Sequence, residues 1–73
     1  MPDYCKLIVS GSPPYQLTIV FFEAEIPCDS QQTEYDNWQA MIDGVYAQIL
    51  NLRRSGWALL RVIDGAYLFE YRP

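Results

Sequence analysis

The chain has 73 residues, of which 51% are hydrophobic and 15% aromatic, and it carries a formal net charge of −4 with no histidine. This length leaves room for one small domain over residues 1–73, and the apolar content is too high for a disordered chain. Only one lysine, Lys6, is present. Nucleic acid is therefore not expected as a partner, because phosphate binding needs several cations on one face.

Two strands are predicted in the first third of the chain. Tyr4–Val9 alternates and is rich in β-branched residues, and Ser10–Pro14 then breaks the strand with a glycine and two prolines. Tyr15–Glu23 is predicted as the second strand, and a longer strand that ends at Ile26 is the alternative. Both faces of this second strand carry apolar residues, which is typical of a strand that is central or covered on both sides.

A long amphipathic helix over Tyr35–Leu52 is the strongest periodic signal. Its apolar residues recur every three or four positions, at Tyr35, Trp38, Ile42, Val45, Ile49 and Leu52. This spacing places them on one side of a helix that needs an apolar surface to lie on. Asp29 or Ser30 is expected to cap the helix, because glutamine follows at the capping-box spacing, and Thr33 is the alternative.

The end of the helix is also marked. Arg53 and Arg54 place positive charge at its negative end, and Gly56 suits the left-handed conformation that terminates helices. Gly44 lies inside the helix, either as a tolerated defect or as a place where another chain approaches closely.

A hairpin is predicted after the helix, because Asp64-Gly65 separates the apolar runs Trp57–Ile63 and Ala66–Arg72. A two-residue turn would place Ile63 opposite Ala66, Val62 opposite Tyr67, Leu60 opposite Phe69 and Ala58 opposite Tyr71. The uncharged face is then expected to meet the helix, and it comprises Ala58, Leu60, Val62, Tyr67, Phe69 and Tyr71. The other face, the sheet back, carries Trp57, Leu59, Arg61, Ile63, Ala66, Leu68, Glu70 and Arg72. On it, Arg61 can pair with Glu70, and Arg72 can lie over the Trp57 ring.

These elements predict an α+β fold, a four-stranded antiparallel β-β-α-β-β sheet with one long helix packed on one face. The strand order stays open. The segments Gly56-Trp57-Ala58-Leu59-Leu60 and Tyr67–Arg72 resemble a class of small uncharacterised bacterial domains in which a helix is followed by a Gly-Trp-x-Leu strand hairpin. That resemblance covers about a third of the chain and implies a fold without any catalytic residue.

Little in the sequence points to catalysis. Without histidine the commonest general base and zinc ligand are missing, so neither an enzyme nor a metal or other cofactor is expected. Cys5 and Cys28 are too few for a secreted disulfide scaffold, and no stretch resembles a targeting or membrane-spanning segment. We therefore expect a cytoplasmic protein with no membrane partner, and a single Cys5–Cys28 disulfide stays an alternative.

The predicted function is protein–protein interaction through the sheet back, which would form a homodimer or dock on another protein. Its contact residues would be Trp57, Leu59, Arg61, Ile63, Leu68 and Arg72, since large apolar patches are seldom left open on a monomer. An alternative structure closes the sheet on itself. The second functional hypothesis is a small-ligand pocket between helix and sheet near Trp38, Tyr67 and Tyr71. A third is an acidic inhibitor of nucleic-acid-binding proteins.

Overall fold

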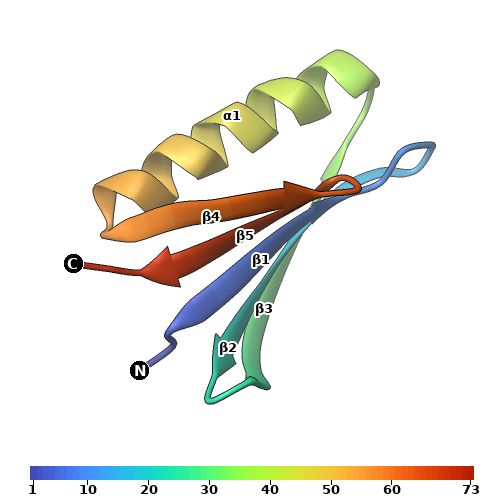
Figure 1. The fold of residues 1–73 in the computed structure, drawn as a ribbon. Helices are drawn as coiled ribbons and strands as arrows, with labels where there is room; N and C mark the ends of the chain where they lie inside the picture. The colour runs from blue at the N-terminus through green and yellow to red at the C-terminus, as the bar shows by residue number, and fades with distance from the viewer.

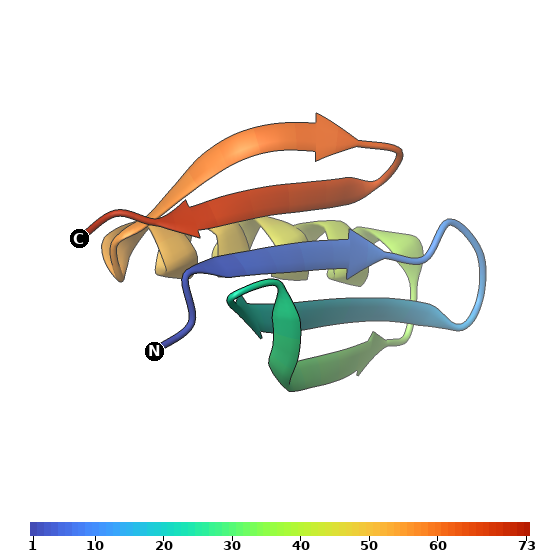
Figure 2. The same cartoon turned by 60° about the horizontal axis from the view of Figure 1, so that its bottom comes forward.

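Five antiparallel strands form a single sheet with one helix on one face in the computed structural model, which describes residues 1–73 (Figures 1 and 2). The elements in chain order are β1 Tyr4–Val9, β2 Tyr15–Glu23, β3 Ile26–Tyr35, α1 Trp38–Arg54, β4 Trp57–Ile63 and β5 Ala66–Tyr71. The strand order is β3-β2-β1-β5-β4. The α+β class and the antiparallel sheet are confirmed, but the prediction of four strands is wrong because it lacks β3.

The missed strand, β3, turns back from β2 and forms one edge of the sheet (Figure 2). Ala24 and Glu25 make the connecting turn, with φ angles of 51° and 68°. Asn-Gly or Asp-Gly is the usual pair at such positions, so the sequence gives little sign of this hairpin. Almost all of β3 is exposed and polar, and therefore it lacks the alternation that marks β1 and β2.

The helix begins later than predicted. Asn37 is the N-cap of α1, and its Oδ1 accepts a hydrogen bond of 2.8 Å from the Ala40 backbone N–H. The predicted caps at Asp29, Ser30 or Thr33 are wrong, because all three residues lie in β3 and pair with β2. The predicted end is confirmed, since α1 stops at Arg54 and Gly56 takes a φ of 98°.

The core lies between α1 and the three middle strands. Its eight buried residues are Cys5, Leu7, Leu17, Ile19, Met41, Val45, Leu52 and Phe69. Each strand residue in this set lies on the face that α1 covers, and the apolar stripe of α1 supplies the other three. Only eight residues of 73 are buried, so the margin of stability that this core can supply is small.

The β4–β5 hairpin has the predicted turn but an irregular register. Ile63 pairs with Ala66 and Val62 with Tyr67, as expected. A β-bulge between Leu59 and Arg61 then shifts the pairing by one residue. The expected pairs of Leu60 with Phe69 and of Ala58 with Tyr71 are therefore wrong. Before the bulge, β4 turns the opposite set of side chains toward the helix.

Candidate interaction surface

The sheet face that α1 leaves uncovered, here called the open face, is built from three rows of directly paired residues. The rows are Phe22–Tyr4–Glu70–Ala58, Val20–Lys6–Leu68–Arg61 and Thr18–Ile8–Ala66–Ile63. Lys6 and Arg61 lie on either side of Leu68 in the middle row. The open face is therefore interrupted by charge, and of its large apolar residues only Ile8 and Ile63 are strongly exposed.

The bulge divides the residues predicted for the sheet back. Arg61, Ile63 and Leu68 do lie together on the open face, where they line a shallow hollow with Lys6 and Ala66. Trp57 does not lie there. It pairs with Tyr71 on the helix side, and its ring is 5.1 Å from that of Tyr71 and 5.7 Å from that of Phe21. Its predicted exposure on the sheet back is therefore wrong.

Arg72 and Glu70 form an ion pair with each other, in place of the predicted contacts of Arg72 with Trp57 and of Glu70 with Arg61. Arg72 Nε lies 2.6 Å from Glu70 Oε1. This contact holds the pKa of Glu70 below its usual range and raises that of Arg72. Tyr4 lies directly opposite Glu70, and the neighbouring carboxylate raises the pKa of Tyr4.

The residues of the predicted ligand pocket do not come together. Trp38 packs edge-on against Tyr15 at the start of α1, with ring centroids 6.0 Å apart. Tyr71 contacts Trp57 near the end of α1. None of the four surface hollows is lined by Trp38, Tyr67 or Tyr71, so the pocket predicted at these residues is wrong.

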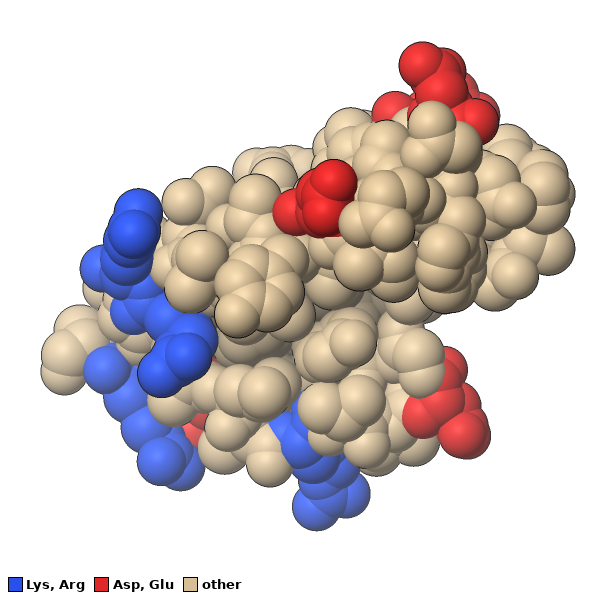
Figure 3. Space-filling view, turned by 90° about the horizontal axis from the view of Figure 1, so that it is seen from above, with Lys and Arg blue, Asp and Glu red and all other residues tan.

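Exposed apolar side chains gather instead along one side of the molecule, where α1 runs beside the edge strand β4. We call this surface the α1–β4 strip and define it by Ile42, Tyr46, Leu59, Leu60 and Val62. Each of these side chains is at least 40% exposed, and Tyr46 reaches 70%. Seen from the helix side, an uncharged surface is hollowed between α1 and the β4–β5 hairpin (Figure 3).

The helix flank in this strip follows from the spacing of its residues. Ile42, Tyr46, Ile49 and Arg53 are separated by four, three and four positions, which places them in one row along α1. Ile49 and Arg53 line a hollow with β4 residues, so this row faces β4. Figure 1 shows α1 and β4 meeting at their connection and diverging toward the start of α1, which leaves the row partly uncovered.

The two edges of the sheet differ sharply in chemistry. At one edge, β3 reads IPCDSQQTEY and contains a proline, two glutamines and two acids. Such an edge resists pairing with another chain. At the other edge, β4 reads WALLRVI, and four of its apolar side chains, Leu59, Leu60, Val62 and Ile63, are at least 40% exposed. Covering the β4 edge with another chain would therefore bury apolar surface, whereas covering the β3 edge would not.

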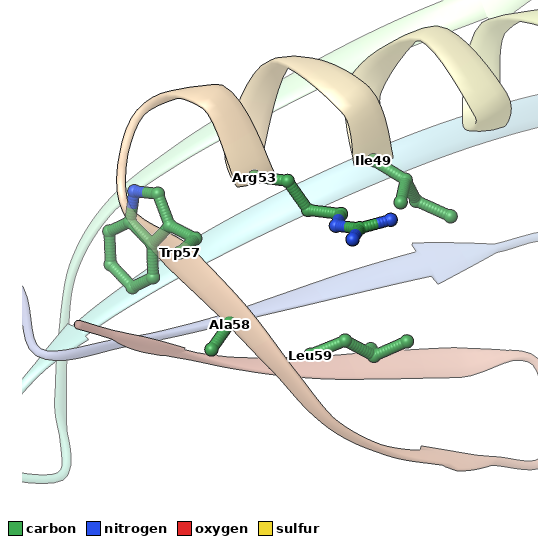
Figure 4. Close-up of a pocket in the computed structure, with 5 residues that line it drawn as sticks. All are labelled: Ile49, Arg53, Trp57, Ala58 and Leu59. Atoms are coloured by element: carbon green, nitrogen blue, oxygen red, sulfur yellow. The ribbon is translucent and has the colours of Figure 1, made fainter. Parts of the chain in front are cut away.

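A hollow of about 500 Å³ lies at the end of the strip where α1 and β4 meet. Its lining residues are Ile49, Arg53, Trp57, Ala58 and Leu59. Figure 4 shows the Arg53 guanidinium extending from α1 into the space between the helix and β4. The hollow thus combines one cation with apolar walls, which suits an apolar group that carries a carboxylate.

Both cysteines are free thiols. Cys5 is buried under α1, and burial raises its pKa to about 12. Cys28 is exposed on β3, at the polar edge. The alternative of a Cys5–Cys28 disulfide is therefore not realised in this structure. No three of the Cys, Asp and Glu side chains lie close enough together to hold a metal ion.

Comparisons with known proteins give no relative from which a role can be carried over. No family model matches the chain, and no similar protein is found among curated sequences or solved structures. The resemblance of Gly56–Arg72 to small bacterial domains therefore stays a prediction. No helix of the structure combines the length and the apolar character needed to cross a membrane.

Proposed function

We propose that the protein is an assembly module that forms a homodimer through the α1–β4 strip. One observation carries this proposal: the strongly exposed apolar residues concentrate on α1 and the β4 edge, while the open face is broken by Lys6 and Arg61. Contiguous apolar surface of this kind usually marks an interface. We place the assembly in the cytoplasm, where free thiols such as that of Cys28 stay reduced.

The small core gives a physical reason for such an assembly. With eight buried residues, the monomer is stabilised by little hydrophobic burial. Covering a Leu or Val side chain that is half exposed contributes about 1 kcal/mol, at roughly 25 cal/mol per Å² of apolar area. Because each copy has several such side chains, the free energy gained by covering them favours the dimer over the monomer.

Val62 and Ile63 offer a matched pair of variants for testing this surface. They are consecutive in β4, their exposed fractions are 56% and 51%, and they lie on opposite faces of the sheet. Light scattering over a concentration series should show a dimer for the wild type and for Ile63→Asp. Val62→Asp should be a folded monomer, because it places a charge in the strip.

The other outcomes are equally informative. If Ile63→Asp dissociates the dimer and Val62→Asp does not, the interface is the open face. A wild type that remains monomeric up to millimolar concentration contradicts the proposed homodimer. Circular dichroism of both variants should match that of the wild type, and Leu59→Asp provides a second test within the strip.

The hollow at Arg53 supports a second candidate function, binding of a small amphipathic carboxylate. Octanoate is a suitable probe, with octanol as the uncharged control. Octanoate should raise the thermal midpoint through its preferential binding to the folded state, whereas octanol should not. Arg53→Gln should abolish the effect. Equal shifts with octanol, or no shift with either compound, would exclude this function.

A further inference from the structure

The two ends of the α1–β4 strip carry opposite charge. Because β4 runs back along α1, Arg53 near the end of the helix lies beside Trp57 at the start of β4, and both line the same hollow. Asp64 follows the last residue of β4 at the other end. Both charged side chains are exposed. In Figure 3 most of the basic groups gather toward the end of α1.

We propose that two copies associate side by side about a two-fold axis near Leu60, with the strips antiparallel, so that Arg53 of each copy faces the partner's Asp64. This arrangement rests on the proposed homodimer and specifies its geometry. An antiparallel alignment brings unlike ends together twice, whereas a parallel alignment brings like charges together. A two-fold axis also makes the same surface serve both copies, as in most homodimers.

The dimensions of the strip fit this arrangement. α1 with 17 residues is about 25 Å long and β4 with seven residues is about 23 Å long. Leu60 is the middle residue of β4, so the two ends of this strand lie at similar distances from it. The bulge between Leu59 and Arg61 interrupts the regular ladder of β4, so the contact is carried by side chains of the strip rather than by a continuous ladder between the two β4 strands.

A charge-exchange experiment tests this geometry directly. Arg53→Glu alone places a second carboxylate against the partner's Asp64 at both contacts, and Asp64→Lys alone places an ammonium group against the partner's Arg53 at both contacts. Each variant should therefore dimerise roughly tenfold more weakly than the wild type at low salt. Mixing the two variants should restore association, because both contacts of the mixed dimer then join unlike charges.

The matched control variants change the same charges away from the strip. Arg54→Glu and Asp43→Lys alter the net charge equally, but Arg54 and Asp43 lie outside the row of Ile42, Tyr46, Ile49 and Arg53 on α1. Neither control should weaken the dimer as much, and mixing them should restore nothing. The effect of Arg53→Glu should shrink at about 0.5 M salt, because exposed charges are then screened. Sedimentation equilibrium with one labelled variant measures the mixed dimer.

Failure of this geometry can be told apart from failure of the proposed function. If the wild type dimerises through Val62 but mixing Arg53→Glu with Asp64→Lys restores nothing, the homodimer stands and the antiparallel pairing is overturned. Residue 64 has a φ of 42°, so Asp64→Lys could unfold the protein. In that case the comparison of Arg53→Glu with Arg54→Glu tests the pairing by itself. Equal effects of these two arginine variants would also overturn the pairing.

Discussion

The missing side chain of Gly44 makes room for the ring of Tyr35, the last residue of β3, which packs against α1. A β-carbon on Gly44 would overlap the hydroxyl end of that ring. The glycine is therefore neither a tolerated defect nor a docking point for another chain. It lets the polar edge of the sheet and the helix approach each other, on the side of α1 opposite the α1–β4 strip.

Gly44→Ala should lower the free energy of unfolding by about 1–2 kcal/mol, because the overlap with Tyr35 outweighs the gain of roughly 1 kcal/mol in helix propensity. In a Tyr35→Ala background the same substitution should raise stability instead. Urea unfolding of the four proteins gives this double-mutant cycle. An equal effect of Gly44→Ala in both backgrounds would show that the contact with Tyr35 has no energetic role.

The two thiols should differ in reactivity by their positions alone. Cys28 is exposed, so one thiol per chain should react rapidly with an aromatic disulfide reagent at mildly alkaline pH. Cys5 has no exposed surface and a pKa of about 12, so it stays protonated and should react only when the protein unfolds. Cys28→Ser should abolish the rapid phase. Two rapid thiols in the native protein would contradict the buried position of Cys5.

At the scale of elements, the β2–β3 turn and the β4 bulge determine the shape of the sheet. The turn is built from two residues with side chains that disfavour positive φ. The bulge shifts the first half of β4 by one residue, which moves Trp57 and Leu59 onto the helix side. One local irregularity thus decides which side chains form the α1–β4 strip.

Replacing Ala24-Glu25 by Asn-Gly should stabilise the protein by about 1 kcal/mol, because Asn and Gly adopt positive φ with less strain. The urea midpoint should rise while its denaturant slope stays unchanged. Asp64→Asn is the matched control at the other two-residue turn, where Asp64-Gly65 already suits the conformation. It should change stability by less than about 0.5 kcal/mol. An unchanged midpoint after the Asn-Gly substitution would mean that the turn at Ala24 carries no strain.

At the scale of the whole molecule, one helix covers one face of a five-stranded sheet, and the two sheet edges remain uncovered. One edge is protected by polar residues and Pro27, whereas the other presents Leu59, Leu60 and Val62. This asymmetry, rather than an apolar sheet back, distinguishes the surface proposed for assembly.

A dimer that dissociates on unfolding predicts a thermal midpoint that depends on protein concentration. Raising the concentration of the wild type about a hundredfold should raise the midpoint by several degrees, since mass action favours the associated folded state. Val62→Asp should show the same midpoint at both concentrations, and Ile63→Asp should behave as the wild type. A wild-type midpoint independent of concentration would contradict a dimer in this range.

The elements with local signals could be predicted from the amino-acid sequence. Periodicity identified β1, β2 and α1, Gly56 and the two arginines marked the end of the helix, and Asp64-Gly65 marked the last turn. It also identified apolar surface in excess of what one small core hides. Each of these features depends on neighbouring residues, so spacing along the chain was sufficient.

Features that depend on pairing between distant segments could not be predicted in this way. β3 exists because its backbone hydrogen-bonds to β2. Its exposed residues are mostly polar and lack the alternation of apolar and polar side chains that predicts a strand. The bulge in β4 exists only in register with β5, and it reversed the predicted faces of Trp57 and Leu59. The excess apolar surface was therefore expected from composition, but its position beside α1 follows from where the bulge and the helix lie.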